Sequence, residues 1–421
     1  MSLTAPLEAG FSKENITPPI GTRMMGWWGR DKESGCKEIV DPLHVRALYL
    51  RQGTQEVLLL TYDLCALTRV ECDRFKGALG TRLNLTPRQI LIATSHTHAG
   101  PATISTPCDP SEHCNPAYVD FLLAATLHAS QAAKAAAQPA KLATGVGTTA
   151  IPMNRRRFVN GVCNNAPNPG GVINNSLPVC RITDRRNRPI ALLFSIATHP
   201  VVVRGWRISA DFPGAAMTEL AADHAMFFQG TGADSRPALL ARGTEWDWES
   251  GPAEARAIGQ ALAAEVRQVV LKPVPSQLRT AIVEMNWPLQ PVPSRQALEA
   301  ETQNSAWAKQ QLDRLQYGPL PTHCPVLLQG IQLGNGLRLV ALEGEPVAAH
   351  GLAIQKFYPR GVTFALGYAN SMAMYLPTSK MLDEGGYEAT CFALFDHAAP
   401  PAKGMERRLQ KALAQLHDAG I

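Results

Sequence analysis

The sequence contains no stretch of about 18 consecutive apolar residues, so it predicts no membrane-spanning helix. It opens without the basic segment and apolar core of a secretory leader, and we expect no secretion signal. Its 40 basic and 35 acidic residues form no long basic run, which gives nucleic-acid binding little support. These absences favour a protein that acts on a small molecule, without stable membrane insertion.

Cysteine usage points to a reducing compartment. The nine cysteines include no Cys-x-x-Cys pair, and their number is odd, so a disulfide framework is not indicated. We therefore expect a cytoplasmic protein with free thiols. Cys108 and Cys114, six positions apart in a Pro-rich loop, are the one pair whose bonding stays open.

Hydrophobic residues make up 45% of the chain and charged residues 18%, a composition typical of globular domains. Strand-like and helix-like segments alternate, which predicts an α/β fold with mixed β-sheets flanked by helices. We expect a single domain over residues 1–421, with the Pro-rich stretch 272–295 as a surface excursion that includes an edge strand at 279–287. The other predicted strands are 57–62, 89–94, 141–147, 179–183, 190–197, 326–333, 337–342 and 362–366, and the predicted helices are 68–83, 118–137, 215–225, 254–271, 297–317 and 403–417.

Five of these apolar strands end in a polar group with chemical potential. Open α/β sheets build their sites at the carboxyl ends of their strands, so these groups are candidates for one shared site. Chance supplies one or two such endings, but five are harder to explain by chance. The groups are Asp63, His96, His199, Glu343 with Glu345, and Asn370.

The run that ends in His96-Thr97-His98 is the most informative. Residues two apart on an extended backbone point the same way, so both imidazoles can face one metal ion. Two neutral imidazoles and a carboxylate, with one open position, are the usual ligand set of a catalytic zinc. The alternatives are structural: His-x-His also caps strand ends, His199 before proline suits a turn, and Glu345 could be a solvated loop residue. The residues alone thus indicate a metal-assisted hydrolase.

An ordered series of motifs resembles the neutral/alkaline, non-lysosomal ceramidase family, and in particular its short bacterial branch without a C-terminal immunoglobulin-like domain. Ser-His-Thr-His-x-Gly-Pro and Ala-Thr-His-Pro, in this order and spacing, are the most specific signals. The matching segments are 9–19, 26–30, 41–47, 95–101, 153–156, 197–200, 209–214, 344–345, 370–375 and 386–388. The resemblance implies the catalytic-domain fold of that family, with a metal site at the strand ends.

The resemblance also implies roles for individual residues. A Zn²⁺ ion would be bound by four side chains, with His98 nearby as an acid/base group and Tyr387 as an alternative to Tyr375 or as a catalytic phenol. Asp63 and Asp211 would orient imidazoles, and other polar groups would contact the substrate. The implied metal ligands are His96, His199, Glu345 and Tyr375; the implied catalytic groups are His98, Tyr387 and Asp63; the implied substrate-binding residues are Arg30, Asn154, Arg155 and Arg236.

One departure from the family concerns the substrate. Arg236 stands where ceramidases carry an active-site serine, and Ser235 is one position off. A guanidinium suits a carboxylate or phosphate, although a salt bridge to Asp234 is an equally simple interpretation. We expect hydrolysis of an amide with a polar or anionic group; an ester or lactone substrate, or a metal-binding homologue without activity, are the alternatives. The sequence gives no oligomeric state.

Overall fold

The structure, a computed structural model, describes residues 5–27, 35–105, 114–220 and 223–421. Its larger sheet is mixed: β4–β5 and β10–β12 pair parallel, and the other neighbours pair antiparallel. The strand order is β12 (Ala225–Gln229), β10 (Pro189–Ile196), β9 (Ser176–Asp184), β6 (Gln138–Thr148), β1 (Leu7–Asn15), β3 (His44–Gln52), β4 (Gln55–Tyr62), β5 (Ile90–Thr94), with β16 (Lys272–Val274) beside β6.

A second sheet of four strands packs face to face on the first. Its order is β17 (Ser276–Pro288), β18 (His323–Gly334), β19 (Leu337–Leu342) and β21 (Val362–Leu366). One apolar core lies between the sheets, because Leu59 and Leu193 of the larger sheet and Ile331 and Phe364 of the smaller belong to the same buried cluster. The predicted edge strand 279–287 lies within β17, at the edge of this second sheet.

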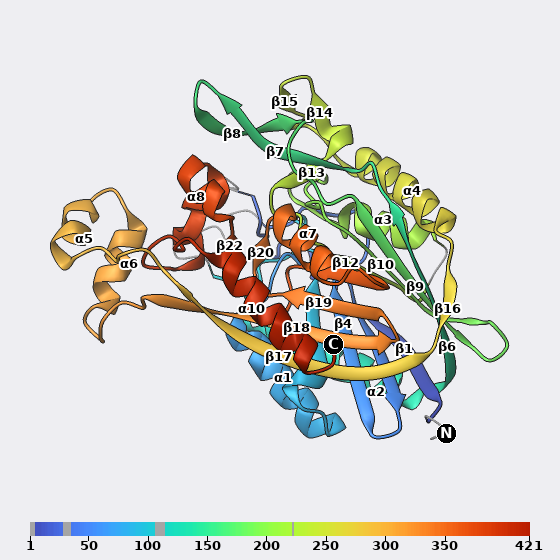
Figure 1. Ribbon diagram of the computed structural model, residues 1–421. Helices are drawn as coiled ribbons and strands as arrows, with labels where there is room; N and C mark the ends of the chain where they lie inside the picture. The colour runs from blue at the N-terminus through green and yellow to red at the C-terminus, as the bar shows by residue number, and fades with distance from the viewer. Residues whose placement is uncertain (1–4, 28–34, 106–113, 221–222) are drawn as a thin grey trace.

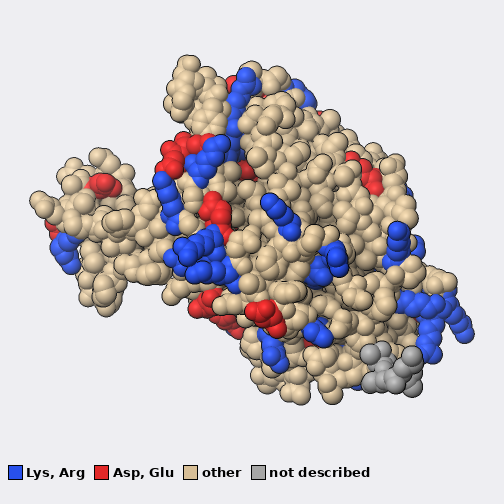
Figure 2. Space-filling model, viewed as in Figure 1, with Lys and Arg blue, Asp and Glu red and all other residues tan. Residues whose placement is uncertain are grey.

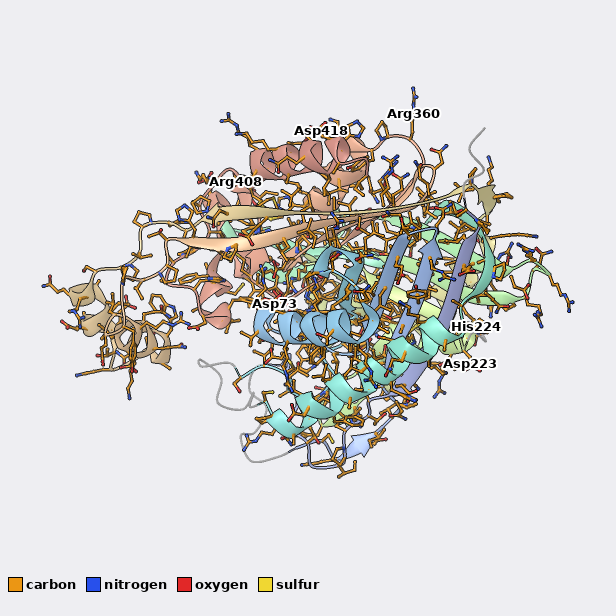
Figure 3. The ribbon with its side chains drawn as sticks, turned by 90° about the horizontal axis from the view of Figure 1, so that it is seen from below. Asp73, Asp223, His224, Arg360, Arg408 and Asp418 are labelled. Atoms are coloured by element: carbon orange, nitrogen blue, oxygen red, sulfur yellow. The ribbon has the colours of Figure 1, made fainter. Side chains whose placement is uncertain are left out.

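Helices cover the outer faces of both sheets, which makes four layers in all (Figure 1). Helices α1 (Arg69–Leu83) and α2 (Pro116–Ala135) cover the β1–β3–β4–β5 half, and α3 (Asp211–Glu219) and α4 (Pro252–Gln268) cover the β9–β10–β12 half. Helices α7 (Ala348–Phe357) and α10 (Met405–Asp418) pack on the second sheet. Figure 3 shows α1, with Asp73, on one side of the molecule and α10, with Arg408 and Asp418, on the other.

Short elements complete the chain. β13 (Ser235–Pro237), β7 (Pro152–Val159) and β8 (Val162–Asn168) form a three-stranded sheet. Three further parallel or antiparallel pairs are β11 (Arg207–Ile208) with β2 (Glu38–Ile39), β14 (Ala241–Arg242) with β15 (Glu245–Trp246), and β20 (Glu345–Pro346) with β22 (Tyr375–Leu376). The remaining helices are α5 (Arg295–Glu301), α6 (Ala306–Arg314), α8 (Ser379–Glu384) and α9 (Tyr387–Thr390).

The surface carries charges of both signs. On the face shown in Figure 2, lysine and arginine side chains are interspersed with acidic ones among a majority of uncharged residues. Within the part of the chain that the structure describes, no helix combines the length and the apolar character needed to cross a bilayer.

Two predicted helices differ from the structure. The segment 215–225 is not one helix: α3 ends at Glu219, and Ala225 begins the fully buried strand β12. The segment 297–317 is divided between α5 and α6, because the Ser305 side chain accepts a hydrogen bond from the Ala308 amide and caps a new helix.

Candidate metal centre

Residues at the ends of four strands, β5, β10, β20 and β22, meet at one point, although these strands lie far apart in the sequence. β5 and β12 lie at opposite ends of the larger sheet. Residues 366–369, at the end of β21 and just after it, bridge both ends through the pairs Ala93–Ala369 and Gly230–Leu366. His96, two residues after β5, and His199, three residues after β10, therefore approach each other, with ring centroids 4.9 Å apart. Closure of the larger sheet by β21 thus creates the site.

Glu345 and Tyr375 reach the same point through the β20–β22 pair. These two residues are direct partners in the parallel register. Glu345 Oε2 lies 3.4 Å from Nε2 of His96 and 3.4 Å from Nε2 of His199, and Tyr375 Oη also lies 3.4 Å from His199 Nε2. The structure thus brings together all four residues that the resemblance implied as metal ligands.

The chemistry of this donor set fits a metal ion. Glu345 Oε2 is buried, and it has no hydrogen-bond partner. The ligand atoms of Glu345, His96 and His199 lie within 4.8 Å of one another. A buried carboxylate oxygen without a donor is costly unless a cation or proton neutralises it, and oxygen and imidazole ligands at this spacing suit zinc. A second group, Cys65 with His96 and His98, shares His96 with the first.

Backbone carbonyls orient the two imidazoles. His96 Nδ1 lies 2.9 Å from Cys65 O, and His199 Nδ1 lies 2.9 Å from Gly232 O. Because a carbonyl oxygen only accepts hydrogen bonds, Nδ1 carries the proton in each ring, and the Nε2 lone pairs converge with Glu345 Oε2 on one position where a cation can bind. Burial lowers the pKa of His96 to about 4 and that of His199 well below its usual value, so both rings are neutral at pH 7. Neutral imidazole is the form that binds metals.

The His96 backbone is held in an uncommon conformation. Its φ is +65°, in the left-handed region that non-glycine residues seldom adopt. Tyr368, with φ +53°, packs its ring on the His96 imidazole at a centroid distance of 4.3 Å. Local strain of this kind is typical of functional sites. Tyr368 was not among the predicted site residues; the pattern singled out Asn370, whose side chain instead donates to Gln329.

Tyr375 contacts a buried network of charges. Arg155 donates from Nη2 to Tyr375 Oη at 3.3 Å and from Nε to Glu388 at 2.8 Å, and Arg156 binds the other oxygen of Glu388. The ring centroids of Tyr387 and Tyr375 lie 5.4 Å apart. The Cζ atom of Arg155 lies 5.3 Å from the Tyr387 ring centroid. A guanidinium that donates to the phenol oxygen stabilises the phenolate, the form in which tyrosine binds a metal.

His98 lies beside the proposed ligands. Its Nε2 is 3.0 Å from Nε2 of His96, and its Nδ1 contacts Gly26 O. The ring packs edge-on against Trp27 at 5.4 Å. His98 is therefore a neighbour of the four-residue set, placed within reach of a group bound there.

The close approach of Gly26 to His98 leads to a testable prediction. A Cβ atom at Gly26 would lie 2.8 Å from His98 Cγ, and the φ of +97° is itself unfavourable for L-residues. We expect Gly26→Ala to destabilise the protein by about 1–2 kcal/mol through its backbone and to displace His98. Gly21→Ala is the matched control, because its φ is +87° and nothing lies within 4 Å of its Cβ position. Urea unfolding of both variants measures the effect, and equal losses of stability would contradict a clash between residue 26 and His98.

Two predicted residues lie in other surroundings. Asp63 accepts two hydrogen bonds of 2.8 Å from Arg46 and one from the His44 amide. Asp211 accepts from the amides of Val202 and Val203. Since carbonyl oxygens hold Nδ1 of both ligand imidazoles, the expectation that these two carboxylates orient them is not met.

The remaining predicted residues also have defined places. Asn154 donates to Val172 O and to Asp234 Oδ2, and it is buried. Arg236, in β13, is 5% exposed and has no salt bridge to Asp234, which instead accepts from the Ala348 amide. Arg30 and Cys108 lie outside the described residues, so the role of the first and the pairing of the second stay predictions.

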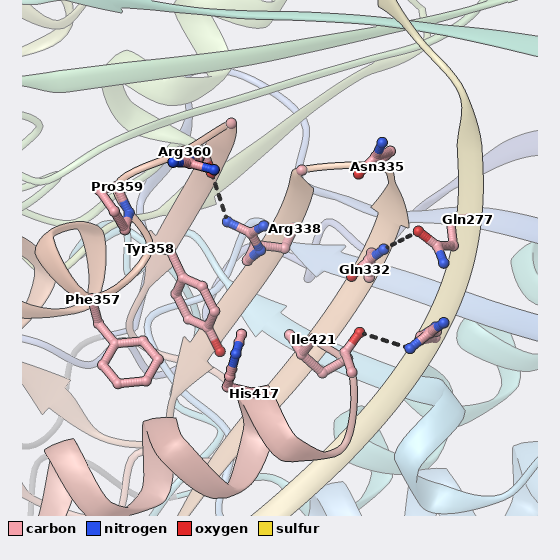
Figure 4. A pocket seen from close by; sticks show the side chains of 14 residues that line it. Gln277, Gln332, Asn335, Arg338, Phe357, Tyr358, Pro359, Arg360, His417 and Ile421 are labelled. Carbon is pink, nitrogen blue, oxygen red and sulfur yellow. Dashed lines mark hydrogen bonds between the residues drawn. The ribbon is translucent and has the colours of Figure 1, made fainter.

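A cavity of about 680 Å³ lies away from these groups (Figure 4). It is bordered by Arg338 of β19, by Tyr358 and by the C-terminal Ile421, and none of the proposed metal ligands lines it. Its Arg338 side chain already donates to Arg360 O and Thr363 Oγ1.

Comparison with known proteins gives matches in structure only. No protein-family model matches the chain, and no curated protein matches its sequence. The neutral ceramidase from Pseudomonas aeruginosa matches with a TM-score of 0.76 and 17% identity, over 98% of this chain and 75% of that chain. A structure of ceramidase complexed with C2 matches with a TM-score of 0.75 and 16% identity, over 98% of this chain and 76% of that chain. The chain therefore has the fold of neutral ceramidase, which confirms the predicted fold class and the resemblance that the motifs indicated.

Proposed function

We propose that the protein is a zinc-dependent hydrolase that cleaves an amide bond other than a peptide bond in a small substrate with a polar or anionic group. One observation carries the proposal: the unpartnered, buried Glu345 Oε2 lies equally close to the Nε2 atoms of His96 and His199. The ceramidase fold supports the choice of an amide.

In this proposal His96, His199, Glu345 and Tyr375 hold the ion. When bound, zinc polarises the scissile carbonyl and lowers the pKa of water. The chain's own groups then handle the protons: His98 accepts and returns one at Nε2, and the hydroxyl of the partly exposed Tyr387 donates to the carbonyl oxygen or to the leaving amine. Burial and Glu345 raise the pKa of the Tyr375 phenol well above its usual value, and Arg155, which donates to its oxygen, opposes this shift, so that a bound cation would complete the stabilisation of the phenolate.

Metal content measured together with turnover tests the proposal. We expect about one zinc per chain, and we expect a chelator to remove zinc and activity on N-acyl amino acids in parallel, with recovery after stoichiometric zinc. His96→Ala should lose both properties, while His323→Ala, which removes an exposed imidazole, should keep them. Activity that survives complete removal of zinc would overturn the mechanism.

The same assay separates the alternative functions. Esters and lactones with the same acyl group as the amide substrate test an esterase or lactonase at this site. A protein that binds zinc but turns over none of the three classes would be the inactive metal-binding homologue.

The cytoplasmic location also stays a proposal. The eight cysteines within the described residues are all free, which is typical of a reducing compartment. Growth of cells that express the chain, followed by fractionation, tests the assignment directly; recovery from the periplasm or the medium would contradict it.

A further inference from the structure

Two arginines and three tryptophans form a cluster beside the metal centre. Arg204 lies in the loop after His199, with its Cζ 3.8 Å from the Trp27 ring centroid and 4.5 Å from that of Trp248. The Arg236 Cζ lies 4.7 Å from Trp248 and 5.6 Å from Trp246. Both guanidinium groups therefore contact the same Trp248 ring, stacked on aromatic faces that hold them in place.

The cluster presents hydrogen-bond donors without acceptors. Six buried N–H atoms have no partner among the described residues: Nε and Nη2 of Arg204, Nε and Nη1 of Arg236, and the indole Nε1 atoms of Trp27 and Trp246. An unsatisfied buried donor is costly, and more so when it is charged. Six of them at one place make a site that suits an acceptor-rich group from outside the chain.

The cluster also carries uncompensated positive charge. Within the described part of the chain, neither Arg204 nor Arg236 has a carboxylate oxygen within salt-bridge distance; the acids that act on Arg204, such as Glu249 and Asp247, do so from farther away. Burial, with Arg155 and Arg204 nearby, lowers the pKa of Arg236 to about 9, so the group is still charged at pH 7. An anion would supply both the charge and the acceptors that are missing.

The position of the cluster links it to the reaction site. The Trp27 ring contacts Arg204 on its face and His98 at a centroid distance of 5.4 Å. Ser235 O, one residue before Arg236, accepts from the His199 amide at 3.1 Å. Arg204 and Trp248 also border a surface cavity of about 330 Å³, and Trp248 is 44% exposed, so one side of the cluster faces solvent.

We propose that Arg204 and Arg236 form an anion-binding subsite next to the metal centre, and that the substrate is an amide whose carboxylate, sulfonate or phosphonate group binds there. The inference rests on the proposed function only in calling the bound molecule the substrate. It explains why an arginine, and not a serine, stands at position 236.

Binding of matched probes tests the subsite in the zinc-loaded protein. N-acetylglycine, N-acetyltaurine and N-acetylaminomethylphosphonate share one acyl group and differ in their anion, and N-acetylglycinamide is the neutral counterpart. Because three tryptophans surround the subsite, we expect the anionic probes to change the intrinsic fluorescence saturably. Arg236→Gln and Arg204→Gln should each weaken this binding by about 10–100-fold, as expected for loss of a charge-assisted contact. Arg82→Gln, which removes an exposed charge on α1, should leave it unchanged.

A stability measurement separates binding from a structural role. Glutamine removes an unpaired buried charge, so Arg236→Gln should unfold at the same or a higher urea concentration than the wild type in the absence of anions. A lower midpoint together with unchanged binding of N-acetylglycine would show that Arg236 is structural and would overturn the inference.

Turnover distinguishes failure of the subsite from failure of the proposed function. Zinc-dependent hydrolysis with equal kcat/KM for N-acetylglycine and N-acetylglycinamide, in wild type and Arg236→Gln alike, would refute the subsite and leave the hydrolase. Arginine-dependent binding without hydrolysis of any amide would support the subsite and refute the hydrolase. The ratios among the three anionic probes identify the anion.

Discussion

Glu345→Gln protein is expected to be isolated with less than about a tenth of the zinc of the wild type and to lose about 10³-fold in kcat/KM for the proposed amide substrate, because the proposed ion would contribute several kcal/mol of transition-state stabilisation. The substitution keeps the size of the side chain and removes the charge that lies 3.4 Å from both imidazoles. Metal analysis after gel filtration, with kinetics on the same preparation, measures both effects.

Unfolding measurements test the prediction for Glu345→Gln independently of activity. Without metal, a neutral amide is easier to bury than an unpaired carboxylate, so Glu345→Gln should be at least as stable as the metal-free wild type. Added zinc should raise the unfolding midpoint of the wild type and leave that of the variant unchanged. Glu299→Gln on α5 removes an exposed carboxylate and serves as the control. Retention of stoichiometric zinc by the Glu345 variant would remove Glu345 from the ligand set.

Where local rules apply, the sequence singled out residues that the structure brings together. A polar residue that ends an apolar strand is readable from one segment, and His96, His199 and Glu345 were found in this way. Their meeting point was not readable, because it depends on the bridges that segment 366–369 makes to both edges of the larger sheet. Tyr375 entered only through the family resemblance, since its pairing with Glu345 is a long-range register.

The same strand-end rule overpredicted elsewhere. Asp63 ends β4 as His96 ends β5, but Asp63 faces Arg46 of the neighbouring strand and forms a buried ion pair. A strand-end pattern does not distinguish a carboxylate that can bind a metal ion from one that forms an ion pair with an arginine. The contact between Trp27 and Arg204 was not predicted. Each is a single loop residue, and only the fold brings the two together.

Local ambiguity explains the errors in the predicted helices. The predicted helix 215–225 runs past the end of α3 at Glu219, and the apolar run 226–229 was assigned to no element, because such short runs suit a buried strand or a buried helix equally. The parallel partner of this run, β10, decides in favour of the strand. By contrast, Ser305 is a typical N-cap residue in the middle of the predicted helix 297–317, and it could have predicted that a new helix begins there.

Glu388 is expected to control stability more than any other polar residue near the site. Its carboxylate is 3% exposed and binds Arg155 and Arg156, with a separation of 2.8 Å to Arg155 Nε. Glu388→Gln leaves the buried Arg155 guanidinium without its carboxylate partner and leaves Arg156 with Glu384 alone, so we expect a loss of about 3–5 kcal/mol in the free energy of unfolding. Glu384→Gln is the matched control: Glu384 also contacts Arg156, at 3.3 Å, but from a more exposed position, and we expect a change of about 0–1 kcal/mol.

The pH dependence of this difference identifies its cause. Burial raises the pKa of Glu388, but Arg155 and Arg156 outweigh it and the pKa is lowered overall. A lowered carboxyl pKa contributes stability that is present above the unfolded value of about 4.3 and is lost as the pH falls through the folded value. The gap between wild type and Glu388→Gln in urea unfolding should therefore be full at pH 7 and shrink below about pH 4. If the difference in stability between wild type and Glu388→Gln stays constant down to acid pH, it reflects lost packing instead of lost charge. In that case the Glu388 charge is not needed to hold Arg155 against Tyr375.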